Sequence, residues 1–182
     1  MRKLTHLELL SRQDTQPKRR LPFCVVLNNV RSLYNVGSIF RTADGVGLEK
    51  IWLCGITGYP PESKISKTAL GAEKEVPWEY VASSKACVSR LRAQGYQVVF
   101  LEQMEGSASY QDFIPKSPVC LVLGNELWGV GEGLLPHGDV AIEITMAGLK
   151  NSLNVTVAFG IIAYHIRNQM VASAAWQAKS CS

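Results

Sequence analysis

Val119-Cys120-Leu121-Val122-Leu123-Gly124-Asn125-Glu126 is the stretch of this sequence that decides the fold. Five consecutive apolar residues, without the alternation of a half-exposed strand, are typical of a strand buried on both faces of a parallel sheet. A glycine and two polar residues follow at the point where that strand would end. Because α/β proteins bind ligands beyond the carboxyl ends of their strands, the stretch predicts an α/β protein with a polar site at one edge of its sheet.

Four other short apolar runs predict further strands, at residues 23–27, 50–54, 97–101 and 140–144. Helical patterns occur at residues 2–10, 35–45, 85–94 and 152–169. Residues 55–66 contain glycine and proline and are predicted to form a long loop. Strands that alternate with helices in this way predict a mostly parallel sheet with helices on both faces.

The bulk properties are typical of a single-domain cytoplasmic protein. The chain has 182 residues, which is about one domain, and 47% of them are apolar. No apolar run approaches the roughly 18 residues of a membrane span, and the polar, basic N-terminus does not resemble a secretory signal. The five cysteines lack Cys-x-x-Cys spacing and the three histidines lack ligand spacing. We therefore expect reduced thiols, no metal and a cytoplasmic location.

Positive charge is concentrated at the N-terminus. The net charge is only +4, but residues 1–31 carry seven Lys or Arg against two acids. A basic arm next to a site favours a polyanionic partner such as nucleic acid, whereas a solvated tail explains the charge equally well. We expect three parts in the chain: a basic arm at residues 1–20, one domain at residues 21–170 and a C-terminal tail at residues 171–182.

A first candidate cluster lies at the start of the predicted helix at residues 35–45. Asn35 suits its N-cap, and Gly37, a poor helix former, permits a close backbone approach in the first turn. On a helical wheel Arg41 lies opposite the apolar face and projects toward whatever lies above the sheet edge. The alternative is an exposed Arg41 paired with Asp44, which contributes only a few tenths of a kcal/mol.

The second cluster follows the predicted strand at residues 119–123. Gly124 leaves space for a flat ligand against the backbone, and Glu126 can bind an amine or a hydroxyl, or orient Arg41. The glycines that follow do not form a Gly-x-Gly-x-x-Gly fingerprint, and the acids among them would repel a pyrophosphate. The chain contains no Walker A sequence either. A nicotinamide- or nucleoside-phosphate-dependent enzyme is therefore the weaker alternative.

The third cluster begins the last predicted helix, where Ser152 suits the N-cap. That helix carries two apolar stripes, the first made of Leu153, Val157, Ile161 and Tyr164 and the second of Val155, Phe159, Ile162 and Ile166. A helix that is apolar on two faces is buried on two faces, and one of them must pack on the sheet. A domain of this size has little material to cover the other face, so we expect a homodimer.

In this order and spacing, the three clusters resemble the motifs of the SpoU (TrmH-like) branch of the SPOUT RNA methyltransferases. The matching segments are residues 35–41, 123–129 and 152–155, with a further likeness at residues 67–72, and the resemblance covers about residues 22–168. It implies an α/β fold with a deep C-terminal trefoil knot and a homodimer. It also implies S-adenosylmethionine (AdoMet) as methyl donor and methylation of a ribose 2′-hydroxyl in tRNA or rRNA.

The resemblance further implies roles for individual residues. The expected catalytic residues are Asn35, Arg41, Glu126, Ser152 and Asn154; the expected cofactor-binding residues are Leu101, Leu123, Gly124, Ile144 and Leu153; the residues expected to bind RNA are Arg19, Arg20, Arg31, Lys64 and Lys67. Because an arginine pKa lies above about 12, we expect Arg41 to position groups and stabilise charge rather than act as a literal base. The alternative is a non-catalytic RNA-binding protein of the same fold, and the intact motifs argue against it.

Overall fold

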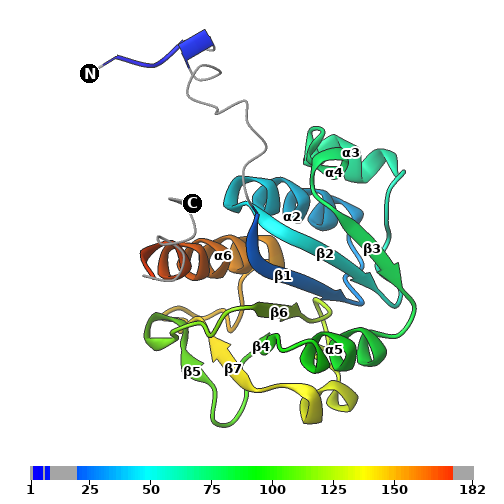
Figure 1. The fold of residues 1–182 in the computed structure, drawn as a ribbon, viewed down its shortest axis with the longest axis vertical. Coiled ribbons are helices and arrows are strands. Elements are labelled where there is room, and N and C mark those ends of the chain that lie inside the picture. Colours follow the sequence, from blue (N-terminus) through cyan, green and yellow to red (C-terminus); the bar gives the residue numbers. More distant parts are fainter. Residues whose placement is uncertain (1, 6, 9–19, 174–182) are drawn as a thin grey trace.

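The computed structural model describes residues 2–5, 7–8 and 20–173 of the chain. Within that part, one sheet of seven strands has the order β3-β2-β1-β6-β4-β7-β5, and all its strand pairs are parallel (Figure 1). The strands are β1 (Leu21–Asn28), β2 (Leu48–Cys54), β3 (Trp78–Val81), β4 (Gln97–Leu101), β5 (Ala108–Ser109), β6 (Val119–Leu123) and β7 (Val140–Glu143).

Helices cover both faces of this sheet (Figure 1). They are α2 (Leu33–Val46), α3 (Ser63–Ala69), α4 (Ala72–Glu75), α5 (Ser84–Ala93) and α6 (Val155–Ala172), with the 3-10 helices η1 (Tyr110–Asp112) and η2 (Glu132–His137). Of the predicted helix at residues 2–10, the structure describes residues 2–5 and 7–8, and of these only residues 7–8 are helical. Most of the arm at residues 1–20 and of the tail at residues 171–182 lies outside the described residues.

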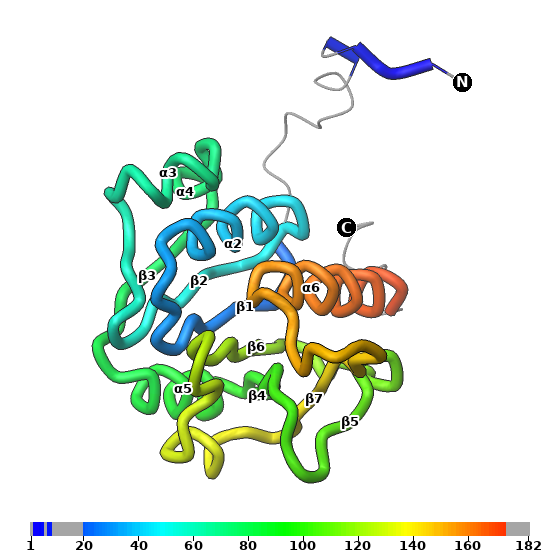
Figure 2. The backbone as a smooth tube through the Cα atoms, turned by 180° about the vertical axis from the view of Figure 1, so that it is seen from behind, coloured from blue at the N-terminus to red at the C-terminus, as the bar shows by residue number. Residues whose placement is uncertain are grey.

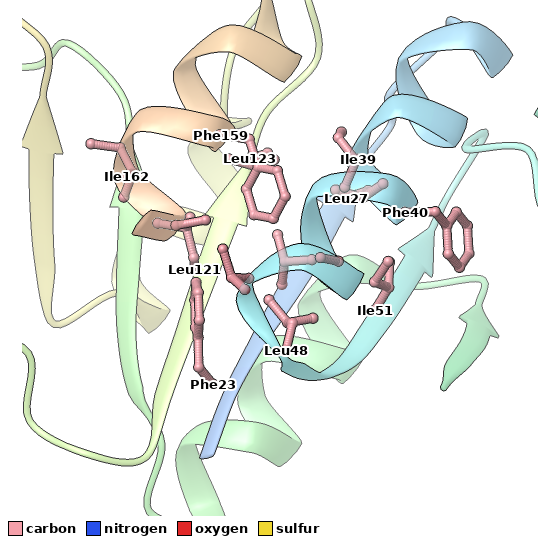
Figure 3. Close-up of a cluster of buried hydrophobic side chains, with 14 of the residues drawn as sticks. Phe23, Leu27, Ile39, Phe40, Leu48, Ile51, Leu121, Leu123, Phe159 and Ile162 are labelled. Atoms are coloured by element: carbon pink, nitrogen blue, oxygen red, sulfur yellow. The ribbon is translucent and has the colours of Figure 1, made fainter. Parts of the chain in front are cut away.

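The central strands are buried on both sides, as their continuous apolar sequence predicts. In β6, Leu121 and Leu123 join a core cluster with Ile39 of α2 and Phe159 of α6 (Figure 3). The intervening Val122 joins a second cluster beneath α5 and η2. The prediction of a mostly parallel sheet with helices on both faces is therefore confirmed. Four cysteines in these clusters, Cys24, Cys54, Cys87 and Cys120, are buried free thiols.

The predicted strand positions agree with the structure to within two residues, whereas the region after β2 differs. The predicted loop at residues 55–66 ends earlier, because α3 begins at Ser63, and the short elements α4, β3 and β5 were not predicted. Helix α3 has only seven residues and buries only Ile65 and Ala69. Two buried side chains are too few to produce a clear helical periodicity in the sequence.

The two predicted N-caps are wrong by two or three residues. Helix α2 is capped by Ser32, whose hydroxyl accepts a hydrogen bond from the N–H of Asn35, and not by Asn35. Helix α6 is capped by Asn154, which accepts from the N–H of Thr156, and not by Ser152. Serine and asparagine are equally good N-caps, so the sequence alone cannot choose between neighbouring candidates. Both asparagines consequently sit at helix starts beside the candidate site.

Gly37 explains how α3 packs on α2. A Cβ at Gly37 would overlap the carbonyl oxygen of Ile65 and the hydroxyl of Thr68, both in α3. The same Thr68 hydroxyl donates to the carbonyl of Tyr34, at 2.9 Å. The close backbone approach predicted for this glycine is therefore present, and it joins two helices of one chain.

Helix α6 lies beside α2 on one face of the sheet (Figure 2). One predicted stripe packs on the sheet: its Phe159, Ile162 and Ile166 are fully buried, and its Val155 is partly buried. On the other stripe, Val157 is 50% exposed and Tyr164 is 47% exposed. Ile161 of this second stripe packs against the core, and Leu153 precedes α6 and lines the cavity, so the exposed part of the stripe is Val157 and Tyr164. Among the described helices, none has the length and apolar character needed to cross a membrane.

Candidate active site

Three loops leave the sheet at the same edge and enclose a cavity. Leu101 at the end of β4 is in register with Leu123 at the end of β6 and with Ile142 of β7. Because the strands are parallel, the chain leaves all three at one edge. The segments that follow them, together with the start of α6, line a cavity of about 720 Å³. This is the carboxyl edge at which the sequence predicts a site.

All five residues expected to bind the cofactor line this cavity. They are Leu101, Leu123, Gly124, Ile144 and Leu153. Three of the expected catalytic residues, Glu126, Ser152 and Asn154, line it as well. Three glutamates, Glu102, Glu126 and Glu143, lie in the lining of the cavity. No lysine or arginine of the described residues lines it. The cavity is therefore suited to an uncharged or cationic ligand rather than to a phosphate.

Glu126 ties the second motif to the first. Its carboxylate accepts hydrogen bonds from the backbone N–H of Arg31 at 3.0 Å and of Ser32 at 3.2 Å, and from the side-chain amide of Asn35 at 3.2 Å. Partial burial acts to raise the pKa of Glu126, but these hydrogen bonds outweigh it and hold that pKa below its ordinary value. Glu126 is therefore a charged anchor for the loop that precedes α2.

Asn35 connects this anchor to the third motif. The amide of Asn154 lies 3.5 Å from the side-chain oxygen of Asn35, at the long limit of a hydrogen bond. The oxygen of Asn154 accepts from the backbone N–H of Thr156 at 2.8 Å and from the Thr156 hydroxyl at 2.7 Å. One polar network thus runs from Glu126 through Asn35 to Asn154, and the three sequence motifs meet as predicted.

The turn that carries Glu126 is held by residues around it. Asn125 and Gly129 exchange two backbone hydrogen bonds of 2.9 Å each, and the Asn125 amide donates to the carbonyl of Asn29 at 2.8 Å. A Cβ at Gly124 would overlap the backbone of Gly129. The folded-back turn therefore occupies the side of Gly124 on which a side chain would project. Gly124 also lines the cavity, so the space for a flat ligand on that side stays a prediction.

Glu102 helps to hold the turn at Gly129, and this role was not predicted from the sequence. Its carboxylate accepts from the backbone N–H of Val130 at 2.9 Å and lies where a Cβ of Gly129 would be. The turn is thereby held against the segment after β4. The available signal was the position of Glu102 directly after a predicted strand, on the same edge as Gly124.

Arg41 lies apart from this network. It is exposed, does not line the cavity, and forms no side-chain hydrogen bond or ion pair within the described part of the chain. Neither expected contact, with Asp44 or with Glu126, is formed. Arg41 lies six residues after Asn35 in α2, or about 9 Å along the helix axis, which is too far from the cavity edge for Glu126 to reach it.

The side of α2 that carries Arg41 lies next to Tyr164 of α6. Gly45 is one turn further along α2, on the same side as Arg41. A Cβ at Gly45 would lie 3.1 Å from the hydroxyl of Tyr164, which belongs to that stripe. Arg41 therefore lies on the side of α2 that Tyr164 approaches, and it does not line the cavity of its own chain.

The residues expected to bind RNA have different surroundings. Arg31, Lys64 and Lys67 are exposed. Arg20 instead donates to the backbone carbonyl of Leu48 at 3.0 Å and of Glu75 at 2.6 Å, so its guanidinium holds the start of β1 against two neighbouring segments. Arg19 lies outside the described residues. Within the described ranges no group of three or more His, Cys, Asp or Glu is arranged to hold a metal ion.

A parallel α/β sheet with a cavity and a polar network at its carboxyl edge defines a ligand-binding protein of the α/β class. The family comparison is more specific. The model of the SpoU rRNA methylase family matches residues 22–164, and the chain belongs to this family. The predicted family and the predicted kind of enzyme, an RNA methyltransferase, are thereby confirmed.

Individual relatives agree with this assignment. The tRNA (guanosine(18)-2′-O)-methyltransferase of Aquifex aeolicus is 31% identical over 158 residues, which are 86% of this chain and 74% of the relative. An AdoMet-bound rRNA methyltransferase from Sinorhizobium meliloti is 28% identical, with a TM-score of 0.77 over 91% of this chain and 70% of that one.

A second solved structure concerns 2-OH methylation of C/U34 on tRNA. It is 26% identical, with a TM-score of 0.71, and the match covers 83% of this chain and 97% of that one. Among the first curated relatives, the chain spans from 60% to 86% of the relative's length. Relatives that share this fold thus differ in length and in the RNA position that their descriptions name.

Proposed function

We infer that this protein transfers a methyl group from AdoMet to a ribose 2′-hydroxyl of tRNA or rRNA. The observation that carries this proposal is the network from Glu126 through Asn35 to Asn154, which joins all three family motifs at the rim of one cavity. Family membership and the AdoMet-bound relative from Sinorhizobium meliloti support the same activity. A protein that only binds RNA would not need the cavity.

The chemistry of the cavity fits AdoMet. Leu101, Leu123 and Ile144 provide apolar walls for an adenine ring, and the loop backbone around them provides donors and acceptors. The glutamates of the lining favour the positive charge of a sulfonium. When bound, AdoMet supplies an electrophilic methyl group and leaves as a neutral thioether.

The residues of this chain contribute mainly by alignment. Glu126 and Asn35 hold the loop before α2, and Asn154 holds the start of α6, so the two sides of the cavity rim are set before a ribose arrives. Ser152 lies in the rim with its hydroxyl free to bind the ribose. We assign Arg41 the role of stabilising negative charge on the ribose oxygen as the hydroxyl proton passes to solvent water, because a guanidinium does not accept that proton at neutral pH.

We propose that Arg41 acts at the cavity of a partner subunit. Its position beside the exposed stripe of α6, away from the cavity of its own chain, supports this arrangement. Pairing two copies through Val157 and Tyr164 would cover that stripe and bring the Arg41 side chain of each copy toward the other. The homodimer is therefore part of the proposed catalytic unit.

The trefoil knot of the family also belongs to the proposal. Segments that follow β4, β6 and β7 all meet around one cavity, and α6 begins there as well. Because these three segments meet around one cavity, we propose that the chain passes through one of its own preceding loops before α6 begins. An experimental structure of the protein traced through residues 102–155 tests it, and a chain that runs outside those loops would exclude the knot.

The decisive experiment is methylation of total cellular RNA with radiolabelled AdoMet, followed by nuclease mapping of the labelled nucleotide. We expect label in a ribose-methylated nucleotide of tRNA or rRNA. Calorimetric titration with AdoMet accompanies it, because a fold that had lost its chemistry would take up no cofactor. Absence of both AdoMet binding and RNA labelling would overturn the proposed function.

A further inference from the structure

Three aromatic side chains gather at the outer edge of the sheet, away from the cavity. Tyr59, in the loop after β2, stacks on Trp78 of β3 with ring centroids 6.1 Å apart and an interplanar angle of 27°. Tyr59 also lies 4.8 Å from the ring centre of Tyr80. Tyr59 is 45% exposed and Tyr80 is 40% exposed. We call these three residues the aromatic edge patch.

The aromatic edge patch is anchored to the loop that holds the candidate active site. The Tyr80 hydroxyl donates to the carbonyl of Gly55 at 3.0 Å. Two residues further on, the Thr57 hydroxyl accepts from the N–H of Val30 at 3.0 Å and donates to the carbonyl of Leu27 at 2.9 Å. Val30 directly precedes Arg31, whose N–H is bound by Glu126. The patch therefore keeps a fixed position relative to Glu126.

Sheet register gives the distance between the patch and the cavity. Tyr80 is in register with Leu53, Leu53 with Leu27, and Leu27 with Leu123. Three strand spacings of about 4.8 Å separate Tyr80 from Leu123, or roughly 14 Å. Both residues belong to the same row of the sheet, near its carboxyl edge. One RNA strand lying along that edge can therefore reach the patch and the cavity together.

The charge beside the patch suits a phosphate backbone. Lys64 and Lys67 follow Tyr59 within eight positions, are exposed, and form no ion pair in the described part of the chain. Glu62 is the acid between them and Tyr59, so positive charge is in excess there. Arg31 lies exposed on the loop between the patch and Glu126. Arg31, Lys64 and Lys67 are thus exposed cations on the segments that follow β1 and β2.

The patch also lies on the side of the molecule away from α6. Strand β3 forms one edge of the sheet, and α6 lies across the middle strands toward the other end (Figure 1). A dimer formed through the exposed stripe of α6 therefore leaves the patch open to solvent.

We propose that the aromatic edge patch stacks an unpaired base of the RNA substrate, a few nucleotides from the methylated ribose. This inference rests on the proposed function. Aromatic faces are the usual platform for unstacked RNA bases, and stacking tolerates any base because every base has a π-face. Lys64 and Lys67 bind the phosphates next to the stacked base. The patch thus anchors the strand while the network at Glu126 positions the ribose.

The test compares Tyr59→Leu with Tyr59→Phe in methylation of total tRNA and of total rRNA, with labelled AdoMet. Tyr59→Leu keeps apolar bulk and loses the ring, so we expect KM for the RNA pool to rise about tenfold with kcat and AdoMet affinity unchanged. Tyr59→Phe keeps the ring and restores a near wild-type KM. Leu70→Asn, which alters an exposed apolar residue outside the patch, serves as the control for general surface changes.

Salt dependence separates stacking from phosphate binding. Losing the aromatic ring that stacks on a base lowers RNA affinity at every salt concentration and leaves the slope of log K against log salt unchanged. Losing a phosphate contact instead reduces that slope. If the wild-type protein methylates RNA and Tyr59→Leu leaves KM unchanged, the stacking proposal is wrong and the proposed function stands. If the wild-type protein methylates no RNA, the proposed function fails first. If the aromatic edge patch binds another protein instead of RNA, Tyr59→Leu leaves the KM for RNA unchanged, and the stacking proposal is wrong.

Discussion

The carboxylate of Glu126 shows how much one residue contributes to assembling this site. It binds two backbone N–H groups and one amide on a segment that lies 91 to 95 positions earlier in the chain. Hydrogen bonds to a charged acceptor are stronger than those between neutral groups. Replacing the carboxylate therefore loosens the loop before α2 as well as the rim of the cavity.

The lowered pKa of Glu126 predicts a pH dependence of stability. An unfolded glutamate has a pKa of about 4.3, and the folded value lies lower. The ionised carboxylate thus stabilises the fold above pH about 4.3, and that contribution is lost as pH falls through the folded pKa. We expect the Tm difference between wild type and Glu126→Gln to be largest near neutral pH and to shrink in acid. Thermal unfolding from pH 7 to pH 3 measures it.

A matched control for this profile is Glu132→Gln, which changes an exposed carboxylate without a hydrogen-bond partner in the described chain. Its Tm should run parallel to that of wild type over the same pH range. A constant Tm difference between wild type and Glu126→Gln down to pH 3 would contradict the assigned role of the carboxylate.

Arg41 carries the clearest catalytic prediction. We expect Arg41→Ala to reduce methyl transfer at least 100-fold, the usual effect of removing a group that stabilises developing charge. AdoMet affinity should remain, because the role assigned to Arg41 is on the ribose hydroxyl and Arg41 does not line the cavity of its own chain. Radiolabel transfer and calorimetry measure the two properties separately. Retained turnover in this variant would remove Arg41 from the mechanism.

Mixed dimers test whether Arg41 acts on the partner's cavity. Arg41→Ala and Glu126→Ala are each expected to be inactive. If the two residues serve one site from different chains, a mixed dimer contains one site with both residues intact, and mixing the variants restores part of the activity. If they act within one chain, no mixture becomes active.

At the scale of elements, strands were the easiest to predict and short helices the hardest. Strands β4 and β6 match their predicted bounds because an unbroken apolar run is itself the mark of two-sided burial. Helix α3 was missed because its fold depends on contacts with α2, through Gly37 and Thr68, rather than on its own pattern. Short helices depend on tertiary packing more than on propensity.

The contact at Gly37 predicts the effect of a single methyl group. Alanine is the better helix former by about 1 kcal/mol, but a Cβ at this position meets the backbone of α3, so α3 must move away from α2. We expect Gly37→Ala to lower the free energy of unfolding by about 1–3 kcal/mol, as other overpacked sites do. Urea unfolding measures this change.

Ser38→Ala is the control in the same helix. Ser38 is half-buried and its side chain forms no hydrogen bond in the described chain, so the exchange should be neutral or slightly stabilising. If Gly37→Ala is as stable as Ser38→Ala, the packing of α3 on α2 is not as close as the structure indicates.

For the whole molecule, the uncovered stripe of α6 predicts an oligomer. Val157 and Tyr164 are about half exposed in the single chain, on a helix whose other face is fully buried. We expect a dimer in solution and a monomer for Val157→Asp, because the charge would be buried in the interface without a partner. Light scattering after size exclusion measures the mass. A wild-type monomer at micromolar concentration would contradict this prediction.

Leu70→Asn is the control for this change, because Leu70 is 66% exposed directly after α3, and α2 lies between α3 and α6 (Figure 2). Asparagine also tolerates the left-handed backbone of this position. This variant should remain dimeric. Loss of methyl transfer in Val157→Asp with preserved Tm would connect the dimer to catalysis.

How much of the site was predictable depends on the range of the interactions. The family resemblance implied the five cofactor-binding residues, and all five line one cavity. Four of them end or directly follow β4, β6 or β7, whose carboxyl ends share an edge of the parallel sheet, and the fifth precedes α6. The role of Glu102 could not be predicted, because it depends on how the turn at Gly129 folds back. The expected contact between Glu126 and Arg41 was wrong, because the N–H groups before α2 lie closer to that carboxylate.

The sequence by itself determined the two-sided burial of the strands, the three polar clusters and the family, because these are properties of residue type and short spacing. Only the tertiary structure decided which clusters meet and how. Asn35 meets Glu126 from 91 positions away and Asn154 from 119 positions away. Those partners are brought together by the strand order, which places β1 beside β6 and α2 beside α6. The same packing carries Arg41 away from the cavity of its own chain, because a helix buried along one face holds its opposite side chains at fixed positions.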